Sequence, residues 1–339
     1  MSHPQNVWLI ACPSSRLGAQ QIMAVTLLDE PVVIYRDAEG VPHALENRCC
    51  HRGVELSLGR VTNDGHLACG YHGWEYDGDG RCVHVPSLCA GTPVPKGFRV
   101  RSYRCIEQDF YIWAWMGDAE PQPEAPPRIR DLALHGWRQG TVRADCRADF
   151  LMENILDSSH VPFVHKGTHP SYFFNRINGF VEYDYELRVT ERGLIVFYPP
   201  LSDADAEFSG DDVSSYLQFE LPDRIYVFQR GAKHHFHLVL HLVREAENRS
   251  RIEWIMVDVA NAPGSVTWDD NYNTTLNQDR VILESAQTNY DRAGADFERH
   301  VPADFPLLQL RKAVEIFDAG EWPARRHELT QRKLVRVRQ

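Results

Sequence analysis

Two cysteines and two histidines stand at a spacing that suits metal binding. Cys49 and His51 are separated by one residue, and Cys69 and His72 follow after a loop-sized gap as a Cys-x-x-His pair. Thiolate sulfur and imidazole nitrogen bind transition metals tightly, so these residues predict a four-ligand site formed by two loops. Zinc would accept this donor set, although structural zinc sites usually take their ligands as Cys-x-x-Cys and His-x-x-x-His pairs.

The distribution of the ligands favours a different metal centre. Each loop supplies one cysteine and one histidine, which suits a Rieske [2Fe–2S] cluster with one iron held by two cysteines and the other by two histidines. Cys49 and Cys69 would hold the first iron, and His51 and His72 the second. Neutral imidazoles raise the reduction potential above that of an all-cysteine cluster, so such a centre accepts electrons readily. A zinc-stabilised pair of loops is the alternative.

A second group of candidate ligands lies further along the chain. Asn154, Asp157 and His160 are three residues apart, and we expect them to line one face of a helix. Pro162 should disrupt this helix and redirect the chain, so that His165 can converge with His160. One histidine near apolar residues is more often a hydrogen-bonded core residue. Two histidines with a carboxylate on the same surface indicate a mononuclear metal site.

Asp279 is the carboxylate expected to complete this second site. It is the one acid in an otherwise mainly apolar stripe of the helix predicted over 269–290, and a buried carboxylate needs a cation or strong donors beside it. A metal bound by His160, His165 and Asp279 would form the two-histidine, one-carboxylate triad of non-haem Fe(II) oxygenases. A salt bridge to an arginine is the alternative, and Glu284, elsewhere on the helix, is the reserve ligand.

Short strands must position the first four ligands. Strand-like runs separated by turns occur at 7–12, 31–35, 43–45, 74–76 and 110–116. They predict a small all-β domain over residues 1–118, with the ligand loops at one end. Four prolines within 119–127 cannot continue a sheet, and they predict a linker over 119–130.

Residues 131–339 predict a second domain that holds the mononuclear site. After the helix expected over 148–160, alternating runs predict antiparallel strands at 183–189, 194–198, 215–220, 225–229, 235–243 and 251–259. One face of the 235–243 strand carries His235, His237, Val239 and His241. We interpret that face as a solvated sheet surface, and a pocket wall that meets a polar or anionic substrate is the alternative.

Composition and charge narrow the function further. With 339 residues, 43% of them hydrophobic, the chain is long enough for two domains with cores of their own. A net charge of −11 without a basic run argues against nucleic-acid binding. No signal peptide is evident, no apolar run reaches membrane-spanning length, and the free cysteines suit a reducing compartment. We therefore expect a cytoplasmic protein that binds no membrane.

The motifs together resemble the alpha (terminal oxygenase) subunits of Rieske non-haem iron oxygenases. The resemblance rests on Glu46-Asn47-Arg48-Cys49-Cys50-His51-Arg52, Gly70-Tyr71-His72-Gly73-Trp74 and Asn154-x-x-Asp157-x-x-His160-x-x-x-x-His165. It is strongest to the alpha-only branch of monooxygenases and demethylases, although Cys50 stands where many members have proline. The family implies an α+β chain, in which an all-β Rieske domain precedes a helix-grip catalytic domain, and a head-to-tail homotrimer.

The resemblance also implies a reaction. A separate flavin or iron–sulfur reductase, or a ferredoxin, would bring electrons from NAD(P)H to the [2Fe–2S] cluster. Asp157 would link His160 to His72 of the partner subunit, and Asn154 would lie near the Fe(II). With O2, the enzyme would hydroxylate or oxidatively O- or N-demethylate a small aromatic or heterocyclic substrate. The alternatives are cis-dihydroxylation of an aromatic ring and, outside enzymes, an electron-transfer or metal-sensing protein that uses the cluster alone.

Overall fold

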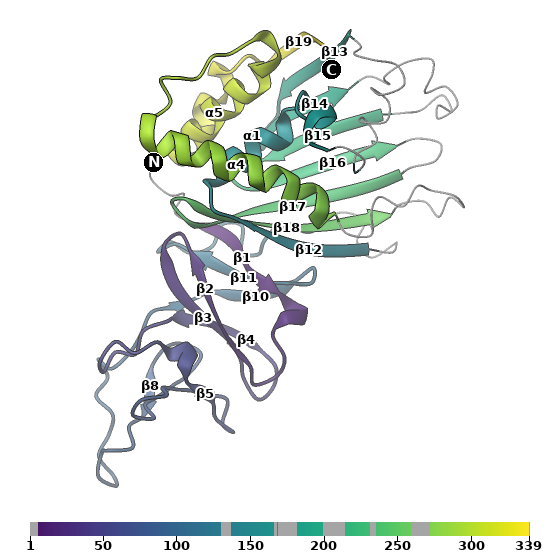
Figure 1. Cartoon of the computed structure of the whole chain (residues 1–339). Coiled ribbons are helices and arrows are strands. Elements are labelled where there is room, and N and C mark those ends of the chain that lie inside the picture. The colour runs from purple at the N-terminus through teal and green to yellow at the C-terminus, as the bar shows by residue number, and fades with distance from the viewer. Residues whose placement is uncertain are drawn as a thin grey trace. The chain divides into compact units, whose positions relative to one another are not determined.

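The computed structural model describes residues 6–129, 137–165, 168, 182–198, 214–230, 235–258 and 272–338. It divides into two compact units, Gln5–Arg128 and Ile129–Gln339 (Figure 1). Within the described ranges, no helix combines the length and the apolar character needed to cross a lipid bilayer.

The first unit is built from three small antiparallel sheets. Their strand orders are β1-β11-β10, β2-β3-β4-β9 and β5-β6-β7-β8. The strands are β1 (Val7–Pro13), β2 (Ile22–Leu27), β3 (Glu30–Arg36), β4 (Pro42–Glu46), β5 (Arg60–Val61), β6 (Leu67–Ala68), β7 (Glu75–Tyr76), β8 (Cys82–His84), β9 (Ser102–Tyr103), β10 (Cys105–Gln108) and β11 (Tyr111–Met116). Two 3₁₀ turns, η1 (Ser14–Arg16) and η2 (Leu56–Leu58), are the helical elements described in this unit. An all-β fold for this part of the chain, as expected from the sequence, is confirmed.

A hydrophobic cluster of the first unit encloses the predicted ligand cysteines. Cys49 and Cys69 are buried in it together with side chains from β3, β4, β6 and β7, among them Val33, Leu45 and Leu67. The proline-rich segment also packs on this unit: Trp8 Nε1 donates a hydrogen bond of 2.9 Å to the carbonyl of Pro123. The two loops that carry Cys49 and Cys69 are therefore anchored in a packed hydrophobic core.

The second unit is organised around one antiparallel sheet of eight strands. Its order is β12-β18-β17-β16-β15-β14-β13-β19. The strands are β12 (Trp137–Ala144), β13 (Glu182–Val189), β14 (Gly193–Tyr198), β15 (Ser214–Glu220), β16 (Arg224–Arg230), β17 (His235–Ala246), β18 (Arg249–Asp258) and β19 (Arg332–Arg338). Six of these strands follow one another in sequence as meander neighbours, so most of the sheet forms from contacts that are close along the chain.

Helices cover one face of this sheet (Figure 1). They are α1 (Ala148–Leu156), α2 (Val161–Val164), α4 (Asn273–Ala293), α5 (Phe305–Asp318) and α6 (Trp322–Arg325), with the 3₁₀ turns η4 (Pro302–Asp304) and η5 (Arg326–Glu328). The core between the two layers joins strand residues such as Leu240 and Trp254 to Leu151 of α1, Leu276 of α4 and Leu310 of α5. The expected α+β class, with an antiparallel sheet and helices, is confirmed.

The helix expected over 148–160 is shorter than the sequence suggested. α1 ends at Leu156, and Asp157 has an extended backbone (φ −80°, ψ 104°). The Asp157 side chain accepts a hydrogen bond of 2.7 Å from the backbone N–H of Ser159, and such Asx turns compete with helix formation. The prediction that Asn154, Asp157 and His160 line one helix face is therefore wrong. Pro162 lies in the first turn of α2, where proline is tolerated.

Two further surface assignments need correction. In the helix predicted over 269–290, Ile282 lies three residues after Asp279 and so belongs to the same predicted apolar stripe, but it is 53% exposed, whereas Gln287 on α4 is buried. Residues 269–271 of that predicted helix lie outside the described residues. In β17, Val239 and His241 are each 1% exposed, so the interpretation of their face as solvated is wrong there. The side chain of His235 lies outside what the structure describes.

Candidate metal centres

Two loops of the first unit share the same local structure. The first follows β4 and carries Cys49, and the second lies between β6 and β7 and carries Cys69. In each loop the cysteine carbonyl accepts a hydrogen bond from a glycine four residues on: Gly53 at 2.9 Å and Gly73 at 3.0 Å. Both glycines have positive φ, +75° and +69°, which a residue with a Cβ adopts at a cost. The closing glycine of each motif is thus required by the turn.

The structure brings the side chains of the two loops together. The rings of His51 and His72 lie 4.6 Å apart between centroids, and the Cys49 and Cys69 side chains are both buried. His51 Nδ1 is buried with no hydrogen-bond partner among the described residues, as a nitrogen reserved for a metal would be. These residues therefore fit the [2Fe–2S] cluster that their types predict.

The spacing distinguishes a cluster from a single zinc ion. Four ligands of one zinc ion lie within about 4 Å of one another, since each is about 2.0–2.3 Å from the metal. In the described part of the chain, three or more ligand atoms come within 4.8 Å of one another at the His160 site alone. The ligand set of the first unit is wider than one ion requires, which favours a two-iron cluster.

Side chains around the first site shape its surroundings. The hydroxyl of Tyr76 lies 3.1 Å from Cys49 Sγ, and it accepts a hydrogen bond of 3.3 Å from the backbone N–H of Cys50. The indole of Trp74 stacks on His51 at 4.4 Å with an interplanar angle of 3°. The second histidine, His72, is exposed. Sequence reasoning missed the roles of Tyr76 and Trp74, and their position directly after the second ligand loop was the available signal.

Burial governs the protonation of these ligands. Burial raises the pKa of the Cys69 thiol, and the neighbouring Cys49 thiol raises it further. The pKa of His51 is lowered by desolvation and by the positive charge of His72 and Arg52. Neutral imidazoles can bind metal directly, whereas the thiols ionise when a metal cation replaces their protons.

The second site joins the two ends of α2 to α4 in the second unit. His160 immediately precedes α2, His165 follows it, and Asp279 lies in the second turn of α4. The two histidine Nε2 atoms are 3.2 Å apart, and Asp279 Oδ1 lies 3.4 Å from His160 Nε2 and 3.2 Å from His165 Nε2. Three ligands on one face of an octahedral ion, each about 2.1 Å from it, are about 3.0 Å apart. The three atoms therefore fit one metal ion with open positions opposite them.

Neighbouring polar groups orient these three side chains. His165 Nδ1 lies 3.0 Å from Gln278 Oε1, which also accepts a hydrogen bond of 2.7 Å from Thr168 Oγ1. Asn154 Nδ2 lies 3.4 Å from Asp279 Oδ1 and 3.5 Å from His160 Nε2. Gln278 had no predicted role; its place beside Asp279 in the sequence was the one indication.

Charges at this site depend on one another. Burial acts to lower the pKa of His160, but the carboxylates of Asp157 and Asp279 outweigh it and raise this pKa to about 9. Burial acts in the opposite sense on Asp279, yet hydrogen bonds from His160 and His165 bring its pKa below the usual value. Asp157 Oδ2 lies 3.8 Å from His160 Nδ1, and its pKa is also lowered, burial notwithstanding. The positive charge of His160 and the negative charges of the two carboxylates thus stabilise one another.

The alternatives for Asp279 can be assessed directly. Within the described ranges, its ion pairs are with the two histidines, and an arginine pair is not among them. Glu284 is engaged elsewhere: its Oε1 accepts a hydrogen bond of 3.0 Å from the backbone N–H of Asp145. The geometry thus favours Asp279 over the reserve candidate.

Comparison with known families agrees with this pair of sites. Residues 7–104 match the Rieske [2Fe-2S] domain, and residues 144–317, just over half of the chain, match the vanillate O-demethylase oxygenase C-terminal domain. The first domain defines the class of protein, a Rieske protein. The chain belongs to the Rieske non-haem iron oxygenases, in the branch whose catalytic domain is of the vanillate O-demethylase type.

Individual relatives give the same picture. The chain is 36% identical over 180 residues to the oxygenase component of dicamba O-demethylase from Stenotrophomonas maltophilia, covering 52% of each chain. It is 37% identical over 167 residues to chlorophyllide a oxygenase from Chlamydomonas reinhardtii, covering 48% of this chain and 25% of the relative. The chain thus spans about half or less of the length of these curated relatives.

A solved structure matches over a longer range. Dicamba monooxygenase bound to dicamba superposes with a TM-score of 0.75, covering 95% of this chain and 99% of the other, at 24% identity. This likeness establishes the fold that the two units share with that enzyme.

Proposed function

We propose that this protein is the terminal oxygenase component of a Rieske monooxygenase. It uses O2 and electrons relayed from a [2Fe–2S] cluster to a mononuclear Fe(II) to hydroxylate, or oxidatively O- or N-demethylate, a small aromatic or heterocyclic substrate. The observation that carries the proposal is the presence in one chain of two different ligand sets, with the atoms of the second set 3.2–3.4 Å apart.

Each ligand has an assigned role in this proposal. Cys49, His51, Cys69 and His72 hold the cluster, and His160, His165 and Asp279 hold the iron. When bound, the cluster supplies single electrons and the iron supplies O2 activation. The carboxylate of Asp157 faces His160 Nδ1 at 3.8 Å, and Asn154 directs an N–H at the oxygen of Asp279.

The substrate class comes from relatives. One is named for the O-demethylation of dicamba and another for the oxidation of chlorophyllide a. A methyl group on oxygen or nitrogen that gains a hydroxyl loses formaldehyde, because the resulting carbon bears two heteroatoms. We therefore propose a substrate with an aromatic or heterocyclic ring that carries such a methyl group or an oxidisable C–H bond.

The partners are proposals of the same kind. A separate reductase, or a ferredoxin, delivers the electrons, and three copies of the chain assemble head to tail in a cytoplasmic homotrimer. A heterologous interface of this type closes as a ring, so that the cluster of one subunit serves the iron of its partner.

Metal analysis with EPR is the first experiment. We expect dithionite-reduced protein to show a Rieske-type signal both in the wild type and in His160→Ala, with iron beyond the cluster content lost in the variant. Zinc in the protein without a paramagnetic cluster would contradict the proposal.

Product analysis then tests the reaction. With a reductase, NADH and ¹⁸O2, a panel of methoxylated and N-methylated aromatic acids and heterocycles should give hydroxylated or demethylated products, with formaldehyde from the demethylations. A cis-diol as the product would identify a dihydroxylating enzyme. Cluster reduction without turnover of any ring substrate would favour an electron-transfer protein.

A further inference from the structure

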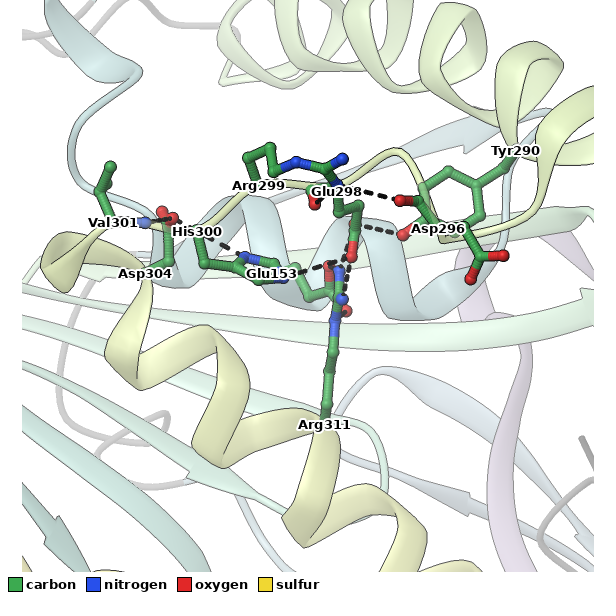
Figure 2. Close-up of polar contacts among 9 residues, drawn as sticks. All are labelled: Glu153, Tyr290, Asp296, Glu298, Arg299, His300, Val301, Asp304 and Arg311. Carbon is green, nitrogen blue, oxygen red and sulfur yellow. Dashed lines mark hydrogen bonds and ion pairs between the residues drawn. The ribbon is translucent and has the colours of Figure 1, made fainter.

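Arg311 joins two carboxylates that come from different parts of the second unit (Figure 2). On α5, its Nε and Nη2 donate hydrogen bonds of 2.7 Å to Oε1 and Oε2 of Glu153. Nη2 also donates a hydrogen bond of 2.8 Å to Glu298 Oε1, while Nη1 bonds the other oxygen of Glu298. A planar guanidinium can hold two carboxylates in this way, and a lysine ammonium cannot.

The first carboxylate belongs to the helix that leads into the iron site. Glu153 lies on α1 directly before Asn154, and its side chain is 10% exposed. The backbone carbonyl of Glu153 accepts a hydrogen bond of 3.0 Å from the N–H of Asp157. Fixing Glu153 therefore fixes the last turn of α1, which carries Asn154 and leads directly to Asp157.

The second carboxylate ties the same arginine to α4. Glu298 lies in the segment between α4 and α5, and the Tyr290 hydroxyl of α4 donates a hydrogen bond to it. The ring of Tyr290 also packs edge-on against Phe150 of α1, with 4.8 Å between centroids. α4 is also the helix that carries Gln278 and Asp279, about three turns before Tyr290.

We infer that Arg311 is a positioning residue for the metal site: by holding α1 and α4 in one arrangement, it places Asn154 of α1 against the ligands Asp279 and His160 and so sets the shape of the triad. The inference rests on the proposed function in one respect, that the triad binds a metal. Arg311 touches none of the three ligands in the described structure, so its effect passes through the two helices.

The pKa values of Glu298 and Glu153 both respond to the guanidinium that they share. The hydrogen bonds of Arg311 lower the pKa of Glu298 to about 2. Burial raises the pKa of Glu153 in spite of the same arginine. The hydrogen bonds and the charge of Arg311 oppose this effect of burial on Glu153.

A metal titration separates positioning from general stability. Chelator-treated protein with its cluster retained and oxidised is titrated with Co(II), and the bound ion is followed by EPR in the wild type, Arg311→Lys and His160→Ala. We expect Arg311→Lys to bind Co(II) about 10–100-fold more weakly, with an altered EPR signal, as for other groups that orient metal ligands. Arg325→Lys is the matched control, because Arg325 bridges Glu321 and Glu328 in the same manner on the surface at α6.

The titration tests the metal site and the positioning role of Arg311 separately. Equal Co(II) binding by the wild type and His160→Ala would remove the metal site itself, and with it the proposed function. If Arg311→Lys binds Co(II) with the same affinity and EPR signal as the wild type, the positioning role alone is overturned. If Arg311→Lys does not fold, Glu298→Gln decides, since it keeps the Glu153 pair: a several-fold loss of affinity with a changed signal upholds the role, and an unchanged titration rejects it.

Discussion

His165 illustrates how one hydrogen bond prepares a histidine to bind a metal. Its Nδ1 lies 3.0 Å from Gln278 Oε1, so an Nδ1–H can donate to this acceptor while a metal takes the lone pair of Nε2, the atom that faces His160 and Asp279. The side chain is 4% exposed, so water does not compete for these positions. Gln278 thus determines the tautomer that a metal needs.

Removing this acceptor should weaken the iron site selectively. We expect Gln278→Ala to lower the affinity for Fe(II) about 10–100-fold, because the ring of His165 loses its fixed tautomer and orientation. Iron content and Fe(II) titration measure the change. Asn277→Ala is the control, since this exposed amide bonds only the carbonyl of Asn273 in the described contacts. Equal Fe(II) affinity in both variants would reject the role of Gln278.

Tyr76 has a comparable part at the first site. Its hydroxyl, 3.1 Å from Cys49 Sγ, can donate to a ligand sulfur whose negative charge grows on reduction. We expect Tyr76→Phe to lower the midpoint potential of the cluster by some tens of mV, on the order of one lost hydrogen bond. A redox titration followed by EPR measures it. Tyr103→Phe, which loses a hydrogen bond to Glu30 instead, should leave the potential unchanged.

At the scale of elements, a break between two short helices creates the histidine pair. α1 stops at Leu156, and residues 157–160 turn the chain before α2 begins. On a straight helix, His160 and His165 would point in directions more than 100° apart, because each residue turns the chain by about 100°. The short α2 and the backbone of His165 directly after it, with φ −96° and ψ 49°, bring the two rings to 5.1 Å between centroids.

The ion pair between Arg311 and Glu298 should make the stability of the folded protein depend on pH. The folded pKa of Glu298 is lowered from 4.5 to about 2, so its stabilising contribution is present above pH 4.5 and disappears as the pH falls towards 2. Allowing for solvent screening at this partly exposed site, the contribution is on the order of 1–2 kcal/mol at neutral pH.

Thermal unfolding of Glu298→Gln beside the wild type measures this contribution. We expect the variant to have the lower Tm at pH 6 and the gap to narrow by pH 3.5, because below pH 4.5 Glu298 takes up a proton in the unfolded wild-type chain while it stays ionised in the folded one. A gap of the same size at both pH values would show that the carboxylate charge is not responsible.

At the scale of the whole molecule, the proposed trimer makes a test of subunit mixing possible. Cys69→Ser subunits lack a cluster and His160→Ala subunits lack the mononuclear iron, so each homotrimer should be inactive. After co-expression in equal amounts, roughly three quarters of the trimers are mixed, and each mixed ring holds one productive pair of centres. We expect about a quarter of wild-type turnover. Electron transfer within one chain would instead leave the mixture inactive.

The sequence alone determined what is local along the chain. The four ligands of the first site lie in two short loops, and the turn that closes each loop depends on a glycine a few residues away. Strand alternation identified most of the eight-stranded sheet, because a side chain's face in a strand follows from its position. His160 and His165 could be paired because they are only five residues apart, although the helix expected to carry His160 ends at Leu156.

Only the tertiary structure decided what depends on distant contacts. Asp279 and Gln278 contact His165 although they lie more than a hundred residues away in the sequence. Arg311 of α5 likewise bonds Glu153 of α1 and Glu298 of the segment before α5. The exposed fraction of Ile282 and the burial of His241 likewise depend on which surfaces the fold covers. Periodicity gives the direction of a side chain on its own element but says nothing of what is packed opposite, since that is fixed by the core as a whole.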